Sequence, residues 1–223
     1  MSSVRKIICL ANSWKKHERC IAGIDVDIGK WVRPVCDTLY PETGKVPKWV
    51  RFVEGREPRL LDLLAIPLDD TGDDFGFECE NHSVLAGQWQ YVGRANIEDV
   101  LPYCDRGESI LHNRWKYVYP SYLRSLPFHQ RTTLQLIFAE RFSIEGKPNG
   151  KGYMDWRGTI VTSRGICLRK IKITDPLLVK KLDDGYEPPN RCLVTMSLSI
   201  PYAFPDWEGE APAWKLIAGV IAM

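Results

Sequence analysis

A polar segment near the start of the chain carries the groups that hold a phosphate and stack a base. It reads Asn12-Ser13-Trp14-Lys15-Lys16-His17 and follows an apolar stretch. Amide, hydroxyl and ammonium groups bind phosphate oxygens, and an indole ring stacks on a base. The alternative is a hairpin loop in which Asn12 and Ser13 satisfy backbone groups while the two lysines keep a sheet edge soluble.

A second candidate pair lies on the third expected strand. Trp31 and Arg33 are two residues apart, so both point to one face, opposite Val32. On an exposed sheet surface, Trp31 would stack a base and Arg33 would pair with a phosphate. Equally, Trp31 would be a core residue and Arg33 a structural ion-pair partner.

Two basic stretches lie in the second half of the chain. In His112–Tyr119, a strand would place the basic side chains on one face and the aromatic rings on the other, which favours an aromatic contact between domains with a wet basic edge. The second stretch contains Arg164, Arg169, Lys170 and Lys172. On strands these side chains divide between two faces, and basic residues on a strand usually form a solvated surface and not a binding site. The last three are retained as candidates for phosphate contacts.

Enzyme motifs are incomplete in this chain. Gly146–Gly152 resembles a phosphate-binding loop, but glycine stands where Ser or Thr would coordinate magnesium. Asp25 and Asp27 share a strand face without a third ligand, and the four histidines have no metal-ligand spacing. Glu145-x-Lys147 ends a metal-nuclease motif whose upstream acid is missing. We therefore expect no catalytic residue, no metal site and no cofactor.

The composition is that of a globular, β-rich protein. The chain has 223 residues, enough for one large domain or two small ones, and is 44% hydrophobic and 26% charged. Its 17 Gly, 15 Pro and numerous aromatic residues are typical of short strands joined by turns. We therefore expect an all-β protein with minor helices.

The net charge of +2 hides a segregation of charge along the chain. Residues 112–181 contain 14 Lys and Arg against 4 Asp and Glu, and the rest of the chain contains 16 against 24. The acids are densest between Glu54 and Glu80, where Asp69–Asp74 is typical of a solvated loop. The net charge therefore gives no argument for a general attraction to nucleic acid, but the basic charge is concentrated in the second half of the chain.

The cysteines and the apolar runs indicate the compartment. Seven cysteines, an odd number, form no Cys-x-x-Cys pair, and several lie in apolar segments. This pattern indicates reduced core residues of a cytoplasmic protein. The longest apolar run, Leu216–Met223, is much shorter than the roughly 18 residues of a membrane-spanning helix, so no membrane partner is expected.

Two successive sets of strands are predicted. The first has strands near 4–10, 18–26, 30–35, 59–66 and 88–94, with a helix at 96–101 that Asn96 caps. The second has strands at 133–145, at 158–173 on both sides of a turn, at 193–200 and at 214–222, with a helix at 174–182. Pro67 and Gly146–Gly150 are expected to end strands. Because five strands and a helix make an OB fold, we expect two consecutive OB-like barrels, at 1–120 and 121–223.

Both ends of the chain resemble a known family. The segments Ile8-Cys9-Leu10-Ala11-Asn12-Ser13, Arg19–Gly23 and Gly29–Val35 resemble the N-terminal signature of the dual OB-fold domain family of prokaryotic conflict systems. Ser197-Leu198 and Trp214–Ile221 resemble its closing strands. The resemblance implies two OB barrels that recognise nucleic acid or a nucleotide, with no established catalytic residues. Between Tyr40 and Tyr153 no motif of the family is found.

The leading hypothesis is a non-enzymatic, cytoplasmic recognition module that binds single-stranded nucleic acid or a nucleotide-like ligand. Its candidate binding residues are Asn12, Ser13, Lys15, Lys16, Trp31, Arg33, Arg169, Lys170 and Lys172. The alternative is a protein-interaction adaptor for an effector of a prokaryotic defence or stress system. A metal-dependent nuclease ranks third.

Overall fold

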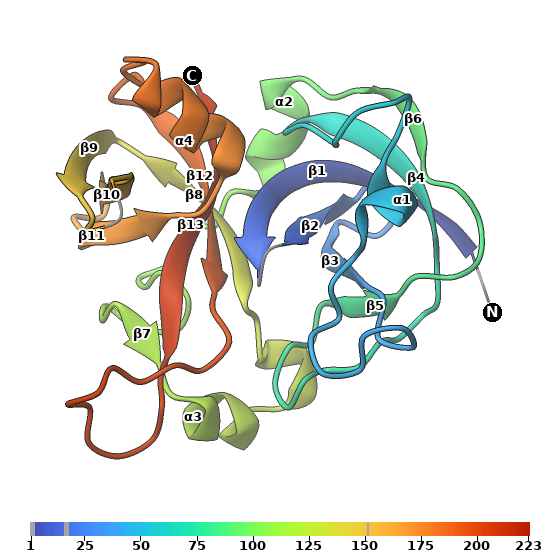
Figure 1. The fold of residues 1–223 in the computed structure, drawn as a ribbon, viewed down its shortest axis with the longest axis horizontal. Helices are drawn as coiled ribbons and strands as arrows, with labels where there is room; N and C mark the ends of the chain where they lie inside the picture. Colours follow the sequence, from blue (N-terminus) through green and yellow to red (C-terminus); the bar gives the residue numbers. More distant parts are fainter. Residues whose placement is uncertain (1–2, 16–17, 151) are drawn as a thin grey trace. The chain divides into compact units, whose positions relative to one another are not determined.

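The computed structural model describes residues 3–15, 18–150 and 152–223. The chain forms two compact units, Met1–Tyr103 and Cys104–Met223, and strands dominate both (Figure 1). The expectation of an all-β protein with minor helices is confirmed. Residues 104–120, which the sequence-based division places in the first domain, lie within the second unit. Nowhere in the described part of the chain is a helix long and apolar enough to span a membrane.

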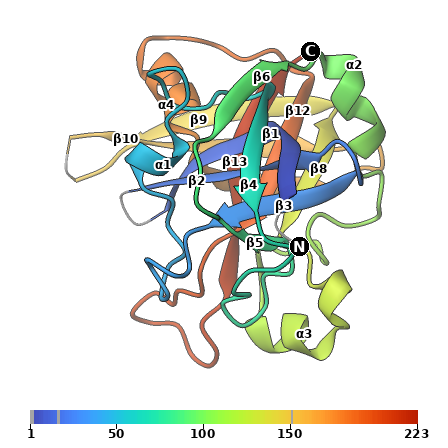
Figure 2. The ribbon, with the colours of Figure 1, turned by 90° about the vertical axis from the view of Figure 1, so that its right-hand side faces the viewer.

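The first unit is built on a six-stranded sheet. Its strands are β1 (Ser3–Lys15), β2 (Glu18–Asp25), β3 (Lys30–Val35), β4 (Asp62–Leu68), β5 (Asn81–Ser83) and β6 (Gln90–Arg94), in the order β5-β3-β2-β1-β4-β6. β3 and β5 are parallel, whereas the other neighbours are antiparallel. Figure 2 shows β1, β4 and β6 side by side.

The first five strands of this unit follow one another in the order of an OB fold. β1 is long enough to pair with β4 through its first half and with β2 through its second half. A bridge between Leu68, at the end of β4, and Val84, directly after β5, joins the remaining two strands. The resulting order, β1-β2-β3-β5-β4, is that of a partly open, five-stranded Greek-key barrel.

The second unit repeats this connectivity. Its strands are β7 (Tyr117–Val118), β8 (Leu134–Ala139), β9 (Arg141–Pro148), β10 (Met154–Val161), β11 (Cys167–Ile173), β12 (Cys192–Leu198) and β13 (Ala213–Ala222). They are ordered β8-β12-β13-β11-β10-β9, with β7 paired to β13, and β11 is parallel to β13 as β3 is to β5. Only Glu140 separates β8 from β9, so together they correspond to the long β1. Neither sheet is a closed barrel, and the expected barrels are corrected in this respect.

Helices are few and short. They are α1 (Lys48–Arg51), α2 (Ile97–Val100), α3 (Pro120–Ser125) and α4 (Pro176–Asp183). α1 and α4 each follow the third strand of their unit, which is the position of the helix in an OB fold. The Asp175 carboxylate caps α4 by accepting hydrogen bonds from the N–H groups of Leu177 and Leu178. At α2 the N–H of Asn96 donates to the Asp99 carboxylate (2.8 Å), which confirms the predicted start of this helix.

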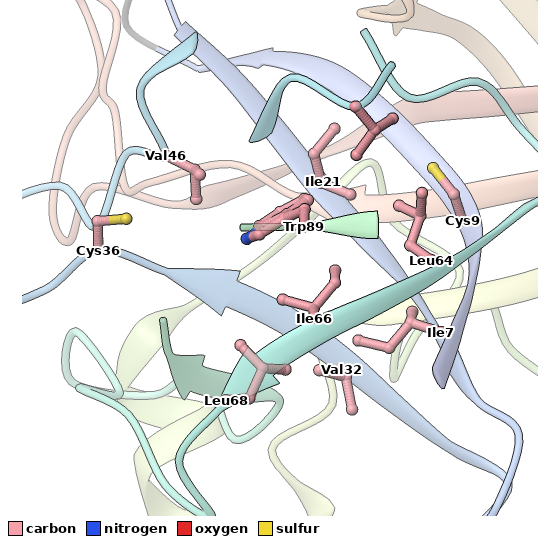
Figure 3. Packing of buried hydrophobic residues seen from close by; sticks show 11 residues of the cluster. Ile7, Cys9, Ile21, Val32, Cys36, Val46, Leu64, Ile66, Leu68 and Trp89 are labelled. Atoms are coloured by element: carbon pink, nitrogen blue, oxygen red, sulfur yellow. The ribbon is translucent and has the colours of Figure 1, made fainter. Parts of the chain in front are cut away.

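Buried apolar side chains from the strands form the core of the first unit (Figure 3). The residues at its centre are Ile7, Ile21, Val32, Leu64, Ile66 and Trp89. Five of them come from β1 to β4, where successive side chains alternate between two faces. Burying each aliphatic side chain stabilises the unit by about 1.5–3 kcal/mol, so this cluster fixes which face of each strand points inward.

Two strands run further than the sequence predicts. β4 continues through Pro67, which pairs with Val4 of β1. β9 continues to Pro148, which pairs with Met154 of β10, so residues 146–148 belong to the strand where the sequence predicts a turn. Proline ends a strand only where the ladder needs the N–H that proline lacks.

Candidate nucleic-acid interface

The outer surface of β9, β10 and β11 carries a group of charged side chains. The buried residues of these strands, Phe142 on β9, Gly158 and Ile160 on β10, and Leu168, Ile171 and Ile173 on β11, face the core of the unit. All charged residues of the three strands lie at the remaining positions: the basic ones are Arg141, Lys147, Arg157, Arg169, Lys170 and Lys172, and the acidic ones are Glu145 and Asp155. Because basic residues outnumber acidic ones, we call this surface the basic face.

The strand register places the two acids among the basic residues. Arg157 lies opposite Lys172 of β11 on one side and opposite Glu145 of β9 on the other. Asp155 accepts hydrogen bonds of 2.7 and 2.9 Å from the Arg157 guanidinium and lies 3.9 Å from the Lys172 ammonium. Glu145 lies 3.5 Å from the Lys170 ammonium. Exposed pairs of this kind contribute about 0–1 kcal/mol each, and the basic face keeps its positive excess.

A β-bulge presents two of the basic side chains together. Ile171 pairs with Gly158 and Leu168 pairs with Ile160, so Arg169 and Lys170 both lie opposite the single residue Thr159. The N–H of Lys170 donates to the Thr159 hydroxyl (3.3 Å). Lys170 has φ = +57°, a left-handed conformation that costs a residue with a side chain about 1–2 kcal/mol. Both side chains are exposed as a result, which the alternation of a regular strand does not allow.

Six aromatic side chains gather in the same unit and are called the aromatic cluster here. They are Tyr117, Tyr119, Tyr202, Phe204, Trp207 and Trp214. Neighbouring ring centroids are 5.2–5.4 Å apart in edge-on geometry, and each such pair contributes about 0.5–1.5 kcal/mol beyond its buried area. Tyr202 and Phe204 nevertheless keep 53% and 54% of their surface exposed, so their rings are available to a ligand.

The aromatic cluster adjoins the basic face. Lys172 of β11 pairs with Leu216 of β13, and Trp214 lies two residues before Leu216 on the same face. Lys172 and Trp214 are separated by the spacing between two neighbouring strands and by two residues along a strand. These two displacements place their Cα atoms about 8 Å apart. The Trp214 indole N–H donates to the Tyr202 carbonyl (2.7 Å), and this bond holds the loop 199–212 against β13. Basic and aromatic groups thus form one continuous surface of the second unit.

The candidate arginine of the first unit lies in a different environment. Arg33 is only 3% exposed, and its guanidinium lies 3.0 Å from the Glu78 carboxylate and donates to the Asn81 side chain (3.1 Å). Burial by itself lowers the pKa of Arg33, but Glu78 and the nearby Glu80 outweigh it and hold that pKa above its ordinary value. The guanidinium is committed to these partners, and we leave Arg33 out of the interface.

The other candidates of the first unit that the structure describes with their side chains are buried or half-buried. Asn12 and Ser13 are buried, and the Asn12 amide donates to the Pro58 carbonyl (2.6 Å). Trp31 is half-buried on β3. The backbone of Lys15 ends β1, whereas its side chain and the whole of Lys16 lie outside the described residues. The Asn12 side chain therefore satisfies a backbone carbonyl, as in the alternative to phosphate binding, and Ser13 is buried beside it in the chain.

A buried lysine in the second unit has unusual partners. Lys215 of β13 is 2% exposed, and its ammonium donates to the Asn113 carbonyl (2.7 Å) and to the Asn113 side-chain oxygen (2.9 Å). Asn113 in turn donates to the Tyr117 carbonyl (3.1 Å), which ties this contact to the aromatic cluster. Burial lowers the pKa of Lys215 to about 7. The lysine positions β7 from inside the unit and does not reach the basic face.

The loop 199–212 was not singled out from the sequence. It contributes Tyr202, Phe204 and Trp207 to the aromatic cluster and connects the fourth and fifth strands of the second unit. Three aromatic residues within one long loop at this place of an OB fold are the signal that would have found it. Within residues 3–15, 18–150 and 152–223, no three His, Cys, Asp or Glu side chains are grouped to hold a metal ion.

Comparison with known proteins agrees with the connectivity of the two units. Residues 5–220 match the dual OB-containing domain family, DuOB, so the match covers nearly the whole chain. Neither the curated proteins nor the solved structures gave a significant match. Since two successive OB-like units fill the matched region, the chain belongs to the dual OB-containing domain family.

Proposed function

We propose that the basic face and the adjoining aromatic cluster of the second unit bind single-stranded nucleic acid. The observation that carries this proposal is the contiguity of exposed Arg169, Lys170 and Lys172 with the aromatic cluster at Trp214. Basic side chains neutralise phosphates, and exposed rings stack on bases that are not paired in a duplex. The proposed activity is binding without chemistry.

The place of this surface in the fold supports the proposal. OB folds bind oligonucleotides on strands two and three and on the loops between strands one and two and between strands four and five. In the second unit these strands are β10 and β11, and the loop between strands four and five is 199–212. A nucleotide-like ligand would use the same groups with a smaller footprint. The surface favours a strand of several nucleotides, because the basic residues span three β-strands.

Fluorescence anisotropy with labelled dT20 and U20 at several salt concentrations tests the proposal. Replacing Arg169, Lys170 and Lys172 together by Ala removes three phosphate contacts, so the slope of log affinity against log salt is expected to fall by about 2, or about 0.7 per contact. A matched control replaces the exposed Lys6, Lys48 and Lys180, which lie outside the basic face, by Ala. The control loses the same charge and is expected to keep the slope.

A second pair of measurements separates stacking from charge. Tyr202→Ala and Phe204→Ala are each expected to weaken dT20 binding by about 1–3 kcal/mol with little change in the salt slope, because stacking releases few ions. The proposal fails if the wild type binds neither oligonucleotide in a salt-sensitive way. It also fails if the control triple variant loses as much affinity as the basic-face triple variant. Either result leaves the protein-interaction adaptor as the function to pursue.

A further inference from the structure

β9 is an edge strand of the second sheet with a free backbone side. Within the described residues its one partner strand is β10, at the end of the strand order, and the other side of β9 is unpaired beyond Phe142. In an antiparallel ladder, alternate residues of an edge strand direct N–H and C=O away from the partner strand. Phe142 is one of these residues, because its N–H donates to the Asn190 carbonyl (2.7 Å) instead of to β10. By the same alternation, Ile144 and Gly146 direct their backbone groups to the open side.

A pocket lies along this open side. It has a volume of about 360 Å³ and is formed between β9, the end of α4 and the segment 185–190. Phe142, Ile144 and Trp156 line it from the sheet, and Leu182 and Tyr186 line it from the covering segment. The Trp156 indole N–H is held by the Asp183 carboxylate (2.7 Å). The pocket therefore has an apolar and aromatic part, lies beside the outward backbone groups of Ile144 and Gly146, and has polar residues at its rim, namely Ser143, Glu187 and Asn190.

The position of Gly146 shows how the wall at Trp156 is built. A Cβ atom added at Gly146 would lie 2.8 Å from the Trp156 ring and 2.6 Å from the Met154 methyl group. The indole thus lies across the backbone of β9, close to its open edge. If a further strand paired with this edge, a side chain of that strand that points toward the pocket would contact the Trp156 ring.

We propose that an extended peptide segment of a partner protein adds to the open edge of β9 and places one apolar side chain in this pocket. Pairing with an extended backbone uses the edge groups of Ile144 and Gly146, which only a peptide can match at strand spacing. Side chains of an added strand alternate, so one points to the pocket while its neighbours face solvent. The site is separate from the basic face, which is formed by outward side chains and not by the strand edge.

A second copy of β9 is a poorer occupant of this edge. In an antiparallel pair centred on Gly146, each Pro148 would lie opposite Ile144 of the other copy and would offer no N–H for the ladder. Such a pair would also leave the pocket without a dedicated side chain, because glycine stands at its centre. Lys147 and Pro148 are residue types that protect edges from self-association.

Selection of random twelve-residue peptides displayed on phage against the full chain tests the proposal. We expect enriched peptides to contain an apolar anchor residue and to lose at least tenfold in affinity when proline replaces residues next to that anchor. In hydrogen exchange, a bound synthetic peptide is expected to slow the amides of Ile144 and Gly146. Those of Ser143 and Glu145 already face β10 and are expected to change little.

Two tyrosine variants complete the test. Tyr186→Ala removes an exposed pocket wall and is expected to weaken peptide binding at least tenfold, whereas Tyr202→Ala, in the aromatic cluster, is expected to leave it unchanged. The proposal is overturned if no peptide is enriched, or if bound peptide leaves the Ile144 and Gly146 amides unchanged. Equal loss in the two variants also overturns it. If the free chain sediments as a dimer with these amides already protected, the occupant is a second copy and the peptide proposal is wrong.

Discussion

The second and third strands of the two units occupy the same place in the connectivity but have opposite environments. In the first unit, most residues of β2 and β3 are buried. Because successive buried residues point to opposite sides, both faces of these strands are covered. In the second unit, β10 and β11 bury alternate residues and expose charged ones. The comparison teaches that an OB-like connectivity does not by itself provide a binding face. Exposure and charge distinguish the second unit, on which the proposed binding face lies, from the first.

The loops between the fourth and fifth strands differ in the same sense. In the first unit the loop after β4 contains Asp69–Asp74, and in the second unit the loop after β12 contains half of the aromatic cluster. An acidic loop repels phosphates, whereas exposed rings accept bases. Both features favour the second unit as the site for nucleic acid.

Buried cations give a third contrast. Arg33 in the first unit faces the Glu78 carboxylate, whereas the ammonium of Lys215 in the second unit donates to neutral Asn113 oxygens. A buried charge with an ionised partner is retained, and a buried charge with neutral partners is held less strongly. The pKa of Arg33 is accordingly raised, and burial lowers that of Lys215 to about 7.

The largest expected effect is on the stability of the first unit. Arg33→Ala leaves Glu78 buried without its cation and is expected to lower the free energy of unfolding by about 3–5 kcal/mol in urea denaturation. Arg169→Ala on the basic face is the matched control and is expected to change it by less than about 0.5 kcal/mol. If Arg33→Ala instead keeps its stability and loses affinity for dT20, the binding surface lies in the first unit and the comparison is reversed.

The next effect concerns the dependence of stability on pH in the second unit. Lys215 has a folded pKa of about 7 and an ordinary value of 10.5, so between these values the unfolded chain binds more protons than the folded one. Stability therefore rises with pH across this window and is lowest below pH 7. Relative to Lys215→Met, the wild type is expected to gain up to about 1.4 kcal/mol per pH unit, or about 2 kcal/mol from pH 7 to pH 9, because Lys215 of the folded chain is still half protonated at pH 7.

Urea denaturation of both proteins at pH 7, 8 and 9 measures this difference. Taking the difference between the two proteins removes the contributions of groups that Lys215 does not influence. Nearby His112 is influenced by it, but burial and Lys215 lower the pKa of His112 from its ordinary value, so this histidine titrates below the measured window. Parallel curves for the wild type and the variant would show that Lys215 stays protonated in the folded state. In that case the contrast between the two buried cations would disappear.

Local patterns in the sequence predicted the strands and helices that depend on neighbouring residues. Alternation and turn residues located β2, β3, β10, β11 and α4 to within a few residues, and Asn96 predicted the start of α2. The three-residue β5 was missed, because it lies in a polar segment and becomes a strand only through its parallel pairing with β3. Short strands formed by distant partners leave no periodic signal.

The candidate site was predicted in part, for a related reason. Arg169, Lys170 and Lys172 were identified by their charge. Arg33 was also selected, because it lies two residues from Trp31, but its partner Glu78 is distant in sequence and could not be foreseen. Alternation showed that Trp31 and Arg33 share a face and could not show whether that face is covered. The bulge at Lys170 was equally invisible, since a regular strand would have turned Arg169 and Lys170 to opposite faces.

A smaller effect would sharpen the role of that bulge. Lys170→Gly relieves the left-handed backbone at φ = +57° and is expected to raise the free energy of unfolding by about 1 kcal/mol, while affinity for dT20 falls because a phosphate contact is lost. Lys172→Gly, at a regular strand position, is the matched control and is expected to lower stability by about 0.5–1 kcal/mol. If both variants lose stability, the Lys170 side chain stabilises the fold by more than its left-handed backbone costs. The bulge would then be explained by stability and not by phosphate binding.

The smallest effect is expected from reduction, and it compares the thiols of the two units. Cys36 in the first unit and Cys192 in the second are buried, and burial raises the pKa of each to about 11, so both are protonated and slow to react at pH 8. Cys167 is exposed on β11 beside the basic face. We expect the same melting temperature with and without reductant, and iodoacetamide to modify Cys167 before Cys36 and Cys192, more slowly when dT20 is bound. A large drop in melting temperature on reduction would reveal a disulfide that stabilises the fold. If saturating dT20 leaves the labelling rate of Cys167 unchanged, the oligonucleotide does not bind over β11. The proposed difference in nucleic-acid binding between the two units would then lose its support.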